Sequence, residues 1–133
     1  MQDEIVKSLK ESGLKITTVR TRILEILNIS IKPLTVHKIL SEIDVNKTTI
    51  YREIDILLKA GYLNKVDFGD GNKRYELSSL DHHHHLVCIK CHAVEDVVLK
   101  ETLFNEENLI SLTNKFKVSY HNLEFFGYCH NCQ

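Results

Sequence analysis

The stretch TTIYREIDILLKAGYLNKVDFGDGNKRYEL, residues 48–77, indicates the fold of the first half of the chain. Its apolar residues first recur at the 3.6-residue spacing of an amphipathic helix, which is expected to end near Ala60 and Gly61. Alternation with a period of two then flanks the segment GDGN at 69–72, whose residue types favour a tight hairpin turn. A set of helices that ends in a hairpin is typical of a winged helix.

Shorter helices are expected before this stretch, because polar residues that can cap a helix precede apolar stripes. A first helix should end near Gly13, and Pro33 should separate the second helix from the third. The expected caps of the second, third and fourth helices are Thr17 or Thr18, Thr35, and Asn46 or Thr48.

The pattern beyond residue 78 predicts a small α/β domain. We expect strands at 86–89, 94–99, 116–120 and 123–128, and a helix at 106–115. The chain is therefore predicted to be of the α/β (α+β) class, with two small domains at 1–78 and 82–133.

Composition sets the class of protein. With 133 residues, 43% of them hydrophobic and 26% charged, the chain is expected to fold, which excludes intrinsic disorder. No apolar run approaches the length that spans a bilayer, and the acidic start at residues 1–4 does not resemble a secretory signal, so a cytoplasmic location is expected. The 17 basic and 18 acidic residues nearly balance, so a face that binds nucleic acid would need local clustering of charge.

The four cysteines form two Cys-x-x-Cys pairs, Cys88 with Cys91 and Cys129 with Cys132. In a reducing compartment, metal binding is a commoner use of such pairs than disulfide formation. A two-residue spacer lets both sulfurs of a pair reach one ion, and four thiolates close a tetrahedral Zn²⁺ site. We therefore predict a structural zinc. Residues 88–92 also match a haem-attachment sequence, but that interpretation requires export and leaves the second pair unexplained.

Four consecutive histidines occupy positions 82–85. If this run enters a strand, alternate side chains point to opposite faces. His83 and His85 would then face one way, and His82 and His84 the other, which predicts two metal sites. The alternative is a solvated surface run.

Other residues can complete both histidine pairs. Glu76 and Asp96 can add carboxylates to the first site, and His121 can join the second. Mixed nitrogen and oxygen ligands suit iron(II), manganese or zinc and do not select one of them.

The winged helix, the histidine-rich hinge and the two cysteine pairs together resemble the ferric uptake regulator family over about residues 12–132. The segments that carry the resemblance are GLKIT at 13–17, TIYR at 49–52, HHHHLVC at 82–88 and FKVSYH at 116–121. The resemblance implies a homodimeric, metal-dependent transcriptional repressor of iron homeostasis that binds a double-stranded DNA operator. It also implies structural Zn²⁺ and regulatory Fe²⁺, with Mn²⁺ or Zn²⁺ as alternatives for the regulatory metal.

By the same resemblance, domain 1–78 binds DNA through the helix that starts at Thr48, and domain 82–133 binds metal and dimerises. Arginine can pair bidentately with guanine, and an aromatic ring can contact a thymine methyl group. The implied DNA-contacting residues are Lys15, Arg20, Thr48, Thr49, Tyr51 and Arg52.

The family's hinge sensory site implies four ligands here, namely Glu76, His83, His85 and Asp96. The family normally adds a histidine just before the third helix, where this chain has Pro33. His37 lies four positions later and is the candidate replacement.

The family's other site implies His82, His84 and His121, together with a glutamate. Phe104 occupies the glutamate position in an alignment without gaps, so Glu101 and Glu106 are the candidate substitutes. His84 stands where many members have aspartate, so the identity of the metal stays open.

Three other functions compete with this interpretation. A peroxide-responsive iron or manganese sensor of the same family fits Asp96 and the segment 116–121. A metal-storage protein or metallochaperone explains the ligands but not the winged helix. An enzyme would need a metal with an open coordination position and a general base, and the sequence contains no His-Glu-x-x-His or nucleophile motif. We therefore expect no enzymatic activity.

Overall fold

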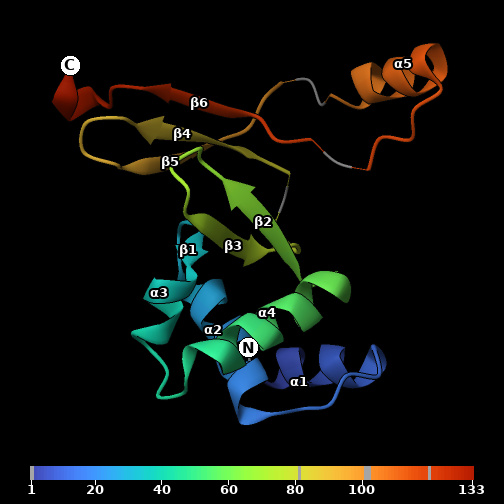
Figure 1. The fold of residues 1–133 in the computed structure, drawn as a ribbon, viewed down its shortest axis with the longest axis vertical. Coiled ribbons are helices and arrows are strands. Elements are labelled where there is room, and N and C mark those ends of the chain that lie inside the picture. The colour runs from blue at the N-terminus through green and yellow to red at the C-terminus, as the bar shows by residue number, and fades with distance from the viewer. Residues whose placement is uncertain (1, 81, 101–102, 120) are drawn as a thin grey trace. The chain divides into compact units, whose positions relative to one another are not determined.

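The computed structural model describes residues 2–80, 82–100, 103–119 and 121–133. Tertiary contacts divide the chain into two compact units, Met1–Asp81 and His82–Gln133. Helices and sheets are mixed in a winged helix followed by a small α/β unit, so the predicted fold class is confirmed (Figure 1). Among the described helices, none has both the length and the apolar character needed to cross a membrane.

The first unit is a winged helix whose small sheet has the strand order β1-β3-β2. Both strand pairs are antiparallel, and β2 and β3 form the predicted hairpin. The two-residue strand β1 was not predicted, because a pair of residues carries no periodic signal. The elements are α1 (Gln2–Glu11), α2 (Thr18–Ile29), β1 (Leu34–Thr35), α3 (Val36–Leu40), α4 (Lys47–Lys59), β2 (Leu63–Asp67) and β3 (Lys73–Leu77).

Side-chain caps fix where three of these helices begin. Thr17, Thr35 and Asn46 each accept a hydrogen bond from the backbone N–H three residues later, at 3.1, 3.2 and 2.9 Å. Each cap satisfies a backbone donor that the first helical turn leaves unpaired, which stabilises a helix by about 1 kcal/mol. The structure therefore selects Thr17 and Asn46 from the predicted pairs of alternatives.

The core of the first unit decides which face of α4 remains exposed. Ile50, Ile54 and Leu57 are buried against residues of α1, α2, α3 and the sheet. Tyr51, which follows Ile50, is 48% exposed. Apolar packing therefore holds α4 in place and turns its polar face to solvent.

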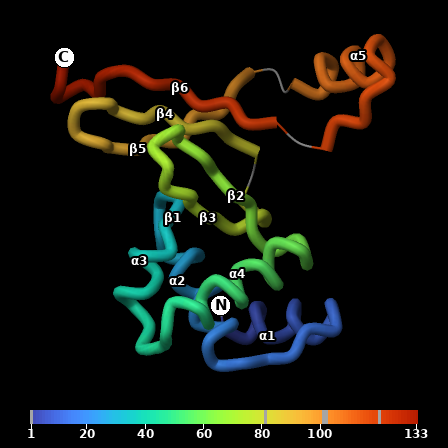
Figure 2. Tube along the Cα trace, viewed as in Figure 1, coloured from blue at the N-terminus to red at the C-terminus, as the bar shows by residue number. Residues whose placement is uncertain are grey.

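The second unit is a three-stranded sheet with the strand order β5-β4-β6. The central strand β4 pairs antiparallel with β5 and parallel with β6, and Figure 2 shows β4 and β6 side by side along the chain trace. The elements are β4 (His84–Cys88), β5 (Val94–Val97), α5 (Phe104–Asn114), β6 (Glu124–Gly127) and a 3-10 turn (His130–Cys132).

The strand predicted at 116–120 is wrong for its described part, 116–119, which is irregular; Tyr120 lies outside the described residues. Lys115 has a left-handed backbone (φ 51°) and ends α5 just before this segment. An alternating segment forms a strand only where it pairs with a neighbouring strand, and the described residues 116–119 pair with no strand of this sheet. Alternation alone therefore did not produce a strand here.

Burial in the second unit is confined to a few side chains. Among its described residues, those that are buried are His84, His85 and Cys88, at 4%, 2% and 3% exposure. All three are residues that the sequence analysis singled out as metal ligands. The interior of this small sheet therefore coincides with its candidate metal centres.

Candidate metal centres and nucleic-acid interface

The two cysteine pairs meet at one end of the second sheet. Cys88 is the last residue of β4 and lies opposite Gly127 of β6 in the parallel register, so Cys129 follows close by. The four sulfurs lie within 4.8 Å of one another, and all four cysteines are free thiols. Cys91 Sγ and Cys129 Sγ are 3.6 Å apart, close to the roughly 3.8 Å between sulfurs of a tetrahedral Zn²⁺ site. The residues present fit a closed four-sulfur site.

Backbone groups and neighbouring thiols give these cysteines different pKa values. The backbone N–H groups of Cys129 and Cys91 point at Cys88 Sγ, at 3.4 and 3.5 Å, and lower the pKa of that thiol to about 6. Hydrogen bonding to Cys129 and burial raise the pKa of Cys132 to about 12. Four thiolates this close repel one another, so a bound cation is needed to hold all four in the ionised form.

His82, His84 and His121 form a cluster whose ligand atoms lie within 4.8 Å of one another. The Nε2 atoms of His82 and His84 are 3.2 Å apart, near the roughly 3.3 Å between two nitrogens bound to one tetrahedral metal ion. His84 Nδ1 lies 3.0 Å from the carbonyl oxygen of Leu123, to which it donates a proton in the neutral ring. Nε2 is then the acceptor, as a metal ligand requires. Burial lowers the pKa of His84, which favours that neutral form.

His121 carries the observation that points most directly to a ligand. Its Nε2 is buried and has no hydrogen-bond partner among the residues that the structure describes. Its Nδ1 lies 2.6 Å from Glu107 Oε1 of α5. A buried nitrogen without a partner is costly, and coordination to a metal would satisfy it.

Glu107 was missed by the sequence analysis. Glu106, one of the two expected acidic residues, is exposed, and the other, Glu101, lies outside the described residues. Helical geometry could have found Glu107, because it lies three residues after Phe104 and so on the same helix face. The aligned position itself is Phe104, and the glutamate lies about one helical turn later.

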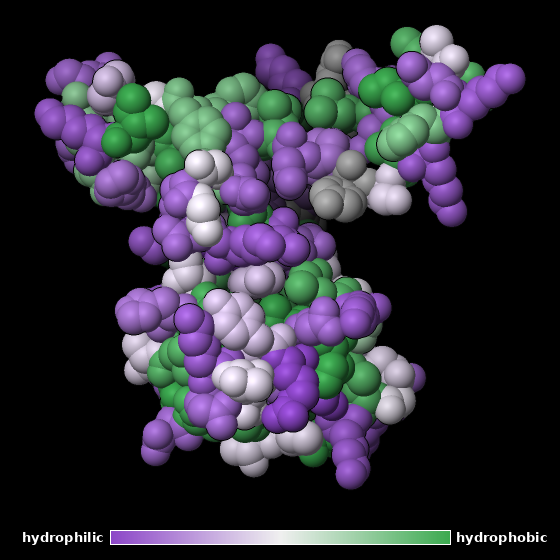
Figure 3. Space-filling model, in the orientation of Figure 1, coloured by the Kyte–Doolittle hydropathy of each residue, from purple (hydrophilic) through white to green (hydrophobic). Residues whose placement is uncertain are grey.

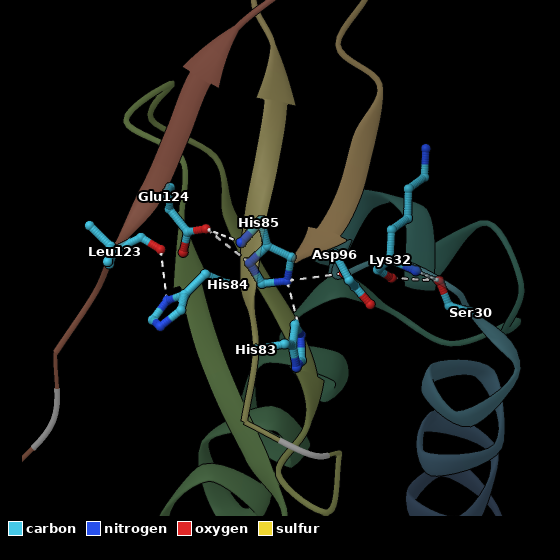
Figure 4. A network of polar contacts seen from close by, with 8 residues as sticks. All are labelled: Ser30, Lys32, His83, His84, His85, Asp96, Leu123 and Glu124. Atoms are coloured by element: carbon cyan, nitrogen blue, oxygen red, sulfur yellow. Dashed lines mark hydrogen bonds and ion pairs between the residues drawn. The ribbon is translucent and has the colours of Figure 1, made fainter. Parts of the chain in front are cut away.

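His83 and His85 form the second cluster, as the alternation expected for the histidine run at 82–85 predicted. Their Nε2 atoms are 3.2 Å apart, and Asp96 Oδ1 of β5 lies 3.7 Å from His85 Nε2. His85 and Asp96 are direct partners in the antiparallel register. Glu124 Oε2 of β6 accepts from His85 Nδ1 at 2.9 Å, as Figure 4 shows. This carboxylate was also missed, because the expected strand at 123–128 was not placed beside β4.

The remaining candidate ligands belong to the first unit. Glu76 lies in β3 opposite Asn64 of β2. His37 is an exposed residue of α3, and Pro33 is buried just before β1. The roles of Glu76 and His37 as metal ligands remain predictions.

The solvent face of α4 carries three of the six residues expected to contact DNA. Thr48, Tyr51 and Arg52 are exposed on it. The Lys47 ammonium lies 5.6 Å from the centroid of the Tyr51 ring. Thr49 is partly buried and donates from its hydroxyl to the Asn46 side chain at 3.0 Å, so it belongs to the helix cap. Lys15 is exposed in the loop before α2.

Arg20 requires a correction, because its guanidinium faces inward. The residue is 6% exposed, and its Nε donates to Glu53 Oε2 of α4 at 2.8 Å. Its Nη1 donates to the backbone carbonyl of Lys15 at 2.7 Å. A buried, paired guanidinium is not presented to DNA. Arg20 instead connects the loop that carries Lys15 to α4.

Comparisons with known proteins agree with this architecture. The model of the ferric uptake regulator family matches residues 11–126. The ferric uptake regulation protein of Legionella pneumophila is 37% identical over 133 residues, covering 96% of this chain and 97% of that protein. The peroxide operon regulator of Bacillus subtilis is 30% identical, covering 97% of this chain and 91% of that protein.

Solved structures support the same assignment. The crystal structure of the Vibrio cholerae ferric uptake regulator superposes with a TM-score of 0.71 at 26% identity, covering 92% of this chain and 98% of that one. The sequence match, the winged helix and the clustered cysteines and histidines agree with one another. The chain therefore belongs to the ferric uptake regulator family of transcription regulators.

Proposed function

We propose that this chain is a metal-dependent transcriptional repressor of iron homeostasis that acts in the cytoplasm as a homodimer on a double-stranded DNA operator. The observation that carries the proposal is the buried Nε2 of His121, which faces His82 and His84 in the same unit as a second histidine cluster. Two histidine clusters that follow a winged helix along the chain are more typical of a metal-sensing regulator than of a storage protein.

A structural Zn²⁺ would be held by the four cysteines. Their spacing and the 3.6 Å separation of Cys91 and Cys129 sulfurs support this role. The ion would supply folding free energy to the second unit and, with its four protein ligands, would leave no position open for chemistry.

The regulatory Fe²⁺ would be held by His83, His85 and Asp96, together with Glu76 of the first unit. Glu76 precedes His83 by only seven positions, so the connection between them is short. An ion that takes ligands from both units binds best to the arrangements that bring those ligands together, and so shifts the population toward them. His37 is the candidate that replaces the family histidine at Pro33.

A second regulatory or structural ion would be held by His82, His84 and His121. The contact between His121 and Glu107 supports Glu107 as the acidic residue of this site, in place of Glu106 or Glu101. A glutamate that accepts from the Nδ1 of His121 fixes the tautomer whose Nε2 can bind metal.

Dimerisation through the second unit is supported by its exposed apolar side chains, which Figure 3 colours green. No described residue of α5 is buried, and its apolar residues Leu109, Ile110 and Leu112 are 65%, 46% and 80% exposed. On β6, Phe125 and Phe126 are 42% and 53% exposed. An apolar surface of this kind marks a protein contact, and a second copy of the chain would cover it.

DNA would be read by the solvent face of α4. Arg52 is suited to a base edge or a phosphate, and Tyr51 to a thymine methyl group. Lys15, in the loop that Arg20 holds against α4, would add a contact to the backbone or the minor groove. Thr48 lies on the exposed face of the first turn.

A peroxide-responsive sensor is the second candidate function. Asp96 beside His85 favours it, as does the similarity to the peroxide operon regulator of Bacillus subtilis. The higher identity to a ferric uptake regulation protein, 37% against 30%, favours iron sensing.

Anaerobic fluorescence anisotropy with an AT-rich palindromic duplex tests the proposal. Zinc-loaded protein should bind the duplex only after Fe²⁺ or Mn²⁺ is added, and a scrambled duplex should remain weakly bound. His83→Ala and His85→Ala should abolish the response while retaining zinc and the dimer. Binding that is independent of added metal would contradict the proposal. Loss of iron-dependent binding after hydrogen peroxide, with loss prevented by Mn²⁺, would favour the peroxide sensor.

A further inference from the structure

Two neighbouring residues, Leu123 and Glu124, orient histidines of both clusters. The carbonyl oxygen of Leu123 lies 3.0 Å from Nδ1 of His84, and Glu124 Oε2 lies 2.9 Å from Nδ1 of His85. His84 and His85 are themselves neighbours on β4, and their side chains point to opposite faces of the sheet, as Figure 4 shows. The start of β6 is therefore in contact with both candidate metal sites.

The Glu124 carboxylate holds His85 through two hydrogen bonds. The backbone N–H of His85 donates to Oε2 at 3.1 Å, and the ring Nδ1 donates to the same oxygen at 2.9 Å. The two side chains are 9% and 3% exposed, so water weakens these contacts little. A ring whose Nδ1–H is held in this way presents Nε2 as the acceptor, toward His83 and Asp96.

The chain places Glu124 only three positions after His121. A metal held by His82, His84 and His121 would therefore tie β4 to the segment that leads into β6. That tie would restrict the register in which Glu124 lies opposite His85. Ordering a group in advance removes part of the entropy cost that a ligand would otherwise have to overcome.

We propose that Glu124 is a positioning residue through which metal at His82, His84 and His121 strengthens metal binding at His83 and His85. The inference rests on the proposed function, because it requires both clusters to bind metal. By linkage, metal at His83 and His85 strengthens binding at the other cluster by the same factor. The two sites then respond to metal together and not as independent sensors.

A double-mutant cycle with Co²⁺ as the probe tests this coupling on the full-length, zinc-loaded protein. The visible absorption band that His83→Ala removes reports the His83 and His85 site. Its dissociation constant is measured in the parent protein, His121→Ala, Glu124→Ala and the double variant. Zinc content and dimer mass are measured for each protein.

Glu124→Ala should weaken Co²⁺ binding at this site by about 10-fold to 100-fold, as losses of a partner that orients a ligand do. His121→Ala should weaken it by about 5-fold or more, and should add nothing in the Glu124→Ala background. Glu124→Gln, which keeps an oxygen acceptor for Nδ1–H, should restore most of the affinity and the parent band shape. Glu95→Gln, on an exposed position of β5, is the matched control and should bind as the parent does.

Equal effects of His121→Ala in both backgrounds would overturn the coupling through Glu124. Parent-like affinity in Glu124→Ala would overturn its positioning role. If Glu124→Ala loses zinc or the dimer, Glu124→Asp, which withdraws the carboxylate from His85, must weaken binding for the proposal to stand. Absence of any His83-dependent band in the parent protein would overturn the proposed metal site itself, and the coupling with it.

Discussion

The first unit buries a continuous apolar cluster from its helices and its sheet, whereas the described part of the second unit buries His84, His85 and Cys88. Leu9, Ile23 and Ile39 have no exposed surface. The difference follows from size, because about 50 residues cannot bury enough apolar area to offset the entropy of ordering the chain. A small unit of that kind needs a metal or a partner chain, and the second unit has the ligands for one and the exposed apolar surface for the other.

The largest effect is expected from removing a zinc ligand of the second unit. Cys88→Ser should release about one Zn²⁺ per chain and unfold the second unit, because structural zinc supplies on the order of 10–16 kcal/mol in small zinc domains. Metal analysis and the molar mass in solution measure the two losses. Ile89→Ser, on the exposed residue that directly follows Cys88, is the matched control. A zinc-free Cys88→Ser dimer with a folded second unit would remove the structural role.

The buried ion pair of the first unit gives the next largest expected effect. Arg20→Ala leaves Glu53 without its partner, so the free energy of unfolding of the first unit should fall by about 3–5 kcal/mol. Arg22→Ala is the control, because that more exposed arginine pairs with Glu25 at 3.5 Å and should contribute less than about 1 kcal/mol. Denaturant unfolding measures both. A stable Arg20→Ala protein with weakened DNA binding would return Arg20 to the interface.

Apolar packing in the first unit predicts a loss that is independent of metal. Ile39→Ala should destabilise this unit by about 2–5 kcal/mol, because the side chain is fully buried. Its zinc content should not change. Ile31→Ala, at a position that is 92% exposed, should have little effect on either quantity. If Ile39→Ala released zinc, the stabilities of the two units would not be separate.

The exposed face of α4 predicts a smaller effect that is confined to DNA. Arg52→Ala should cost about 1–3 kcal/mol of binding to a specific operator if it contacts a base edge. If it contacts phosphate, binding should weaken equally on all sequences, with a shallower dependence on salt. Anisotropy titrations at several salt concentrations distinguish the two. Unchanged binding on every duplex would exclude Arg52 from the interface.

The smallest expected effect is the loss of metal affinity on replacing His37. His37→Ala should weaken Fe²⁺ or Mn²⁺ binding by about 10-fold if His37 replaces the ligand that Pro33 removes. His130→Ala, another exposed histidine, is the control. A metal titration of the zinc-loaded protein that His37→Ala leaves unaltered would show that the sensory site works without it.

Local features of the first unit could be predicted because they depend on short stretches of sequence. Residue type alone predicted the cap at Thr35 and the hairpin at 69–72, and it narrowed the other two caps to Thr17 or Thr18 and to Asn46 or Thr48. The inward turn of Arg20 could not be predicted, because Glu53 lies 33 residues away. An arginine beside an expected DNA contact has the same local sequence whether it faces solvent or an ion pair.

The candidate ligands could be predicted from spacing and alternation, but not the residues that orient them. The structure clusters the four cysteines, and it separates His82 and His84 from His83 and His85. Glu107 and Glu124 become neighbours of histidines through α5 and the parallel register of β4 and β6. Parallel pairing leaves no turn in the sequence from which that register can be inferred.

Hydrogen exchange before and after metal removal tests the central claim most directly, namely that metal coordination and not an apolar core stabilises the fold of the second unit. Full-length protein should show protected backbone amides in α2, α4, β4 and β6. After chelation, we expect amides of β4, β5 and β6 to exchange at rates near those of an unfolded chain, while α2 and α4 keep their protection. Retained protection in β4 and β6 of protein shown to be free of metal would contradict the account.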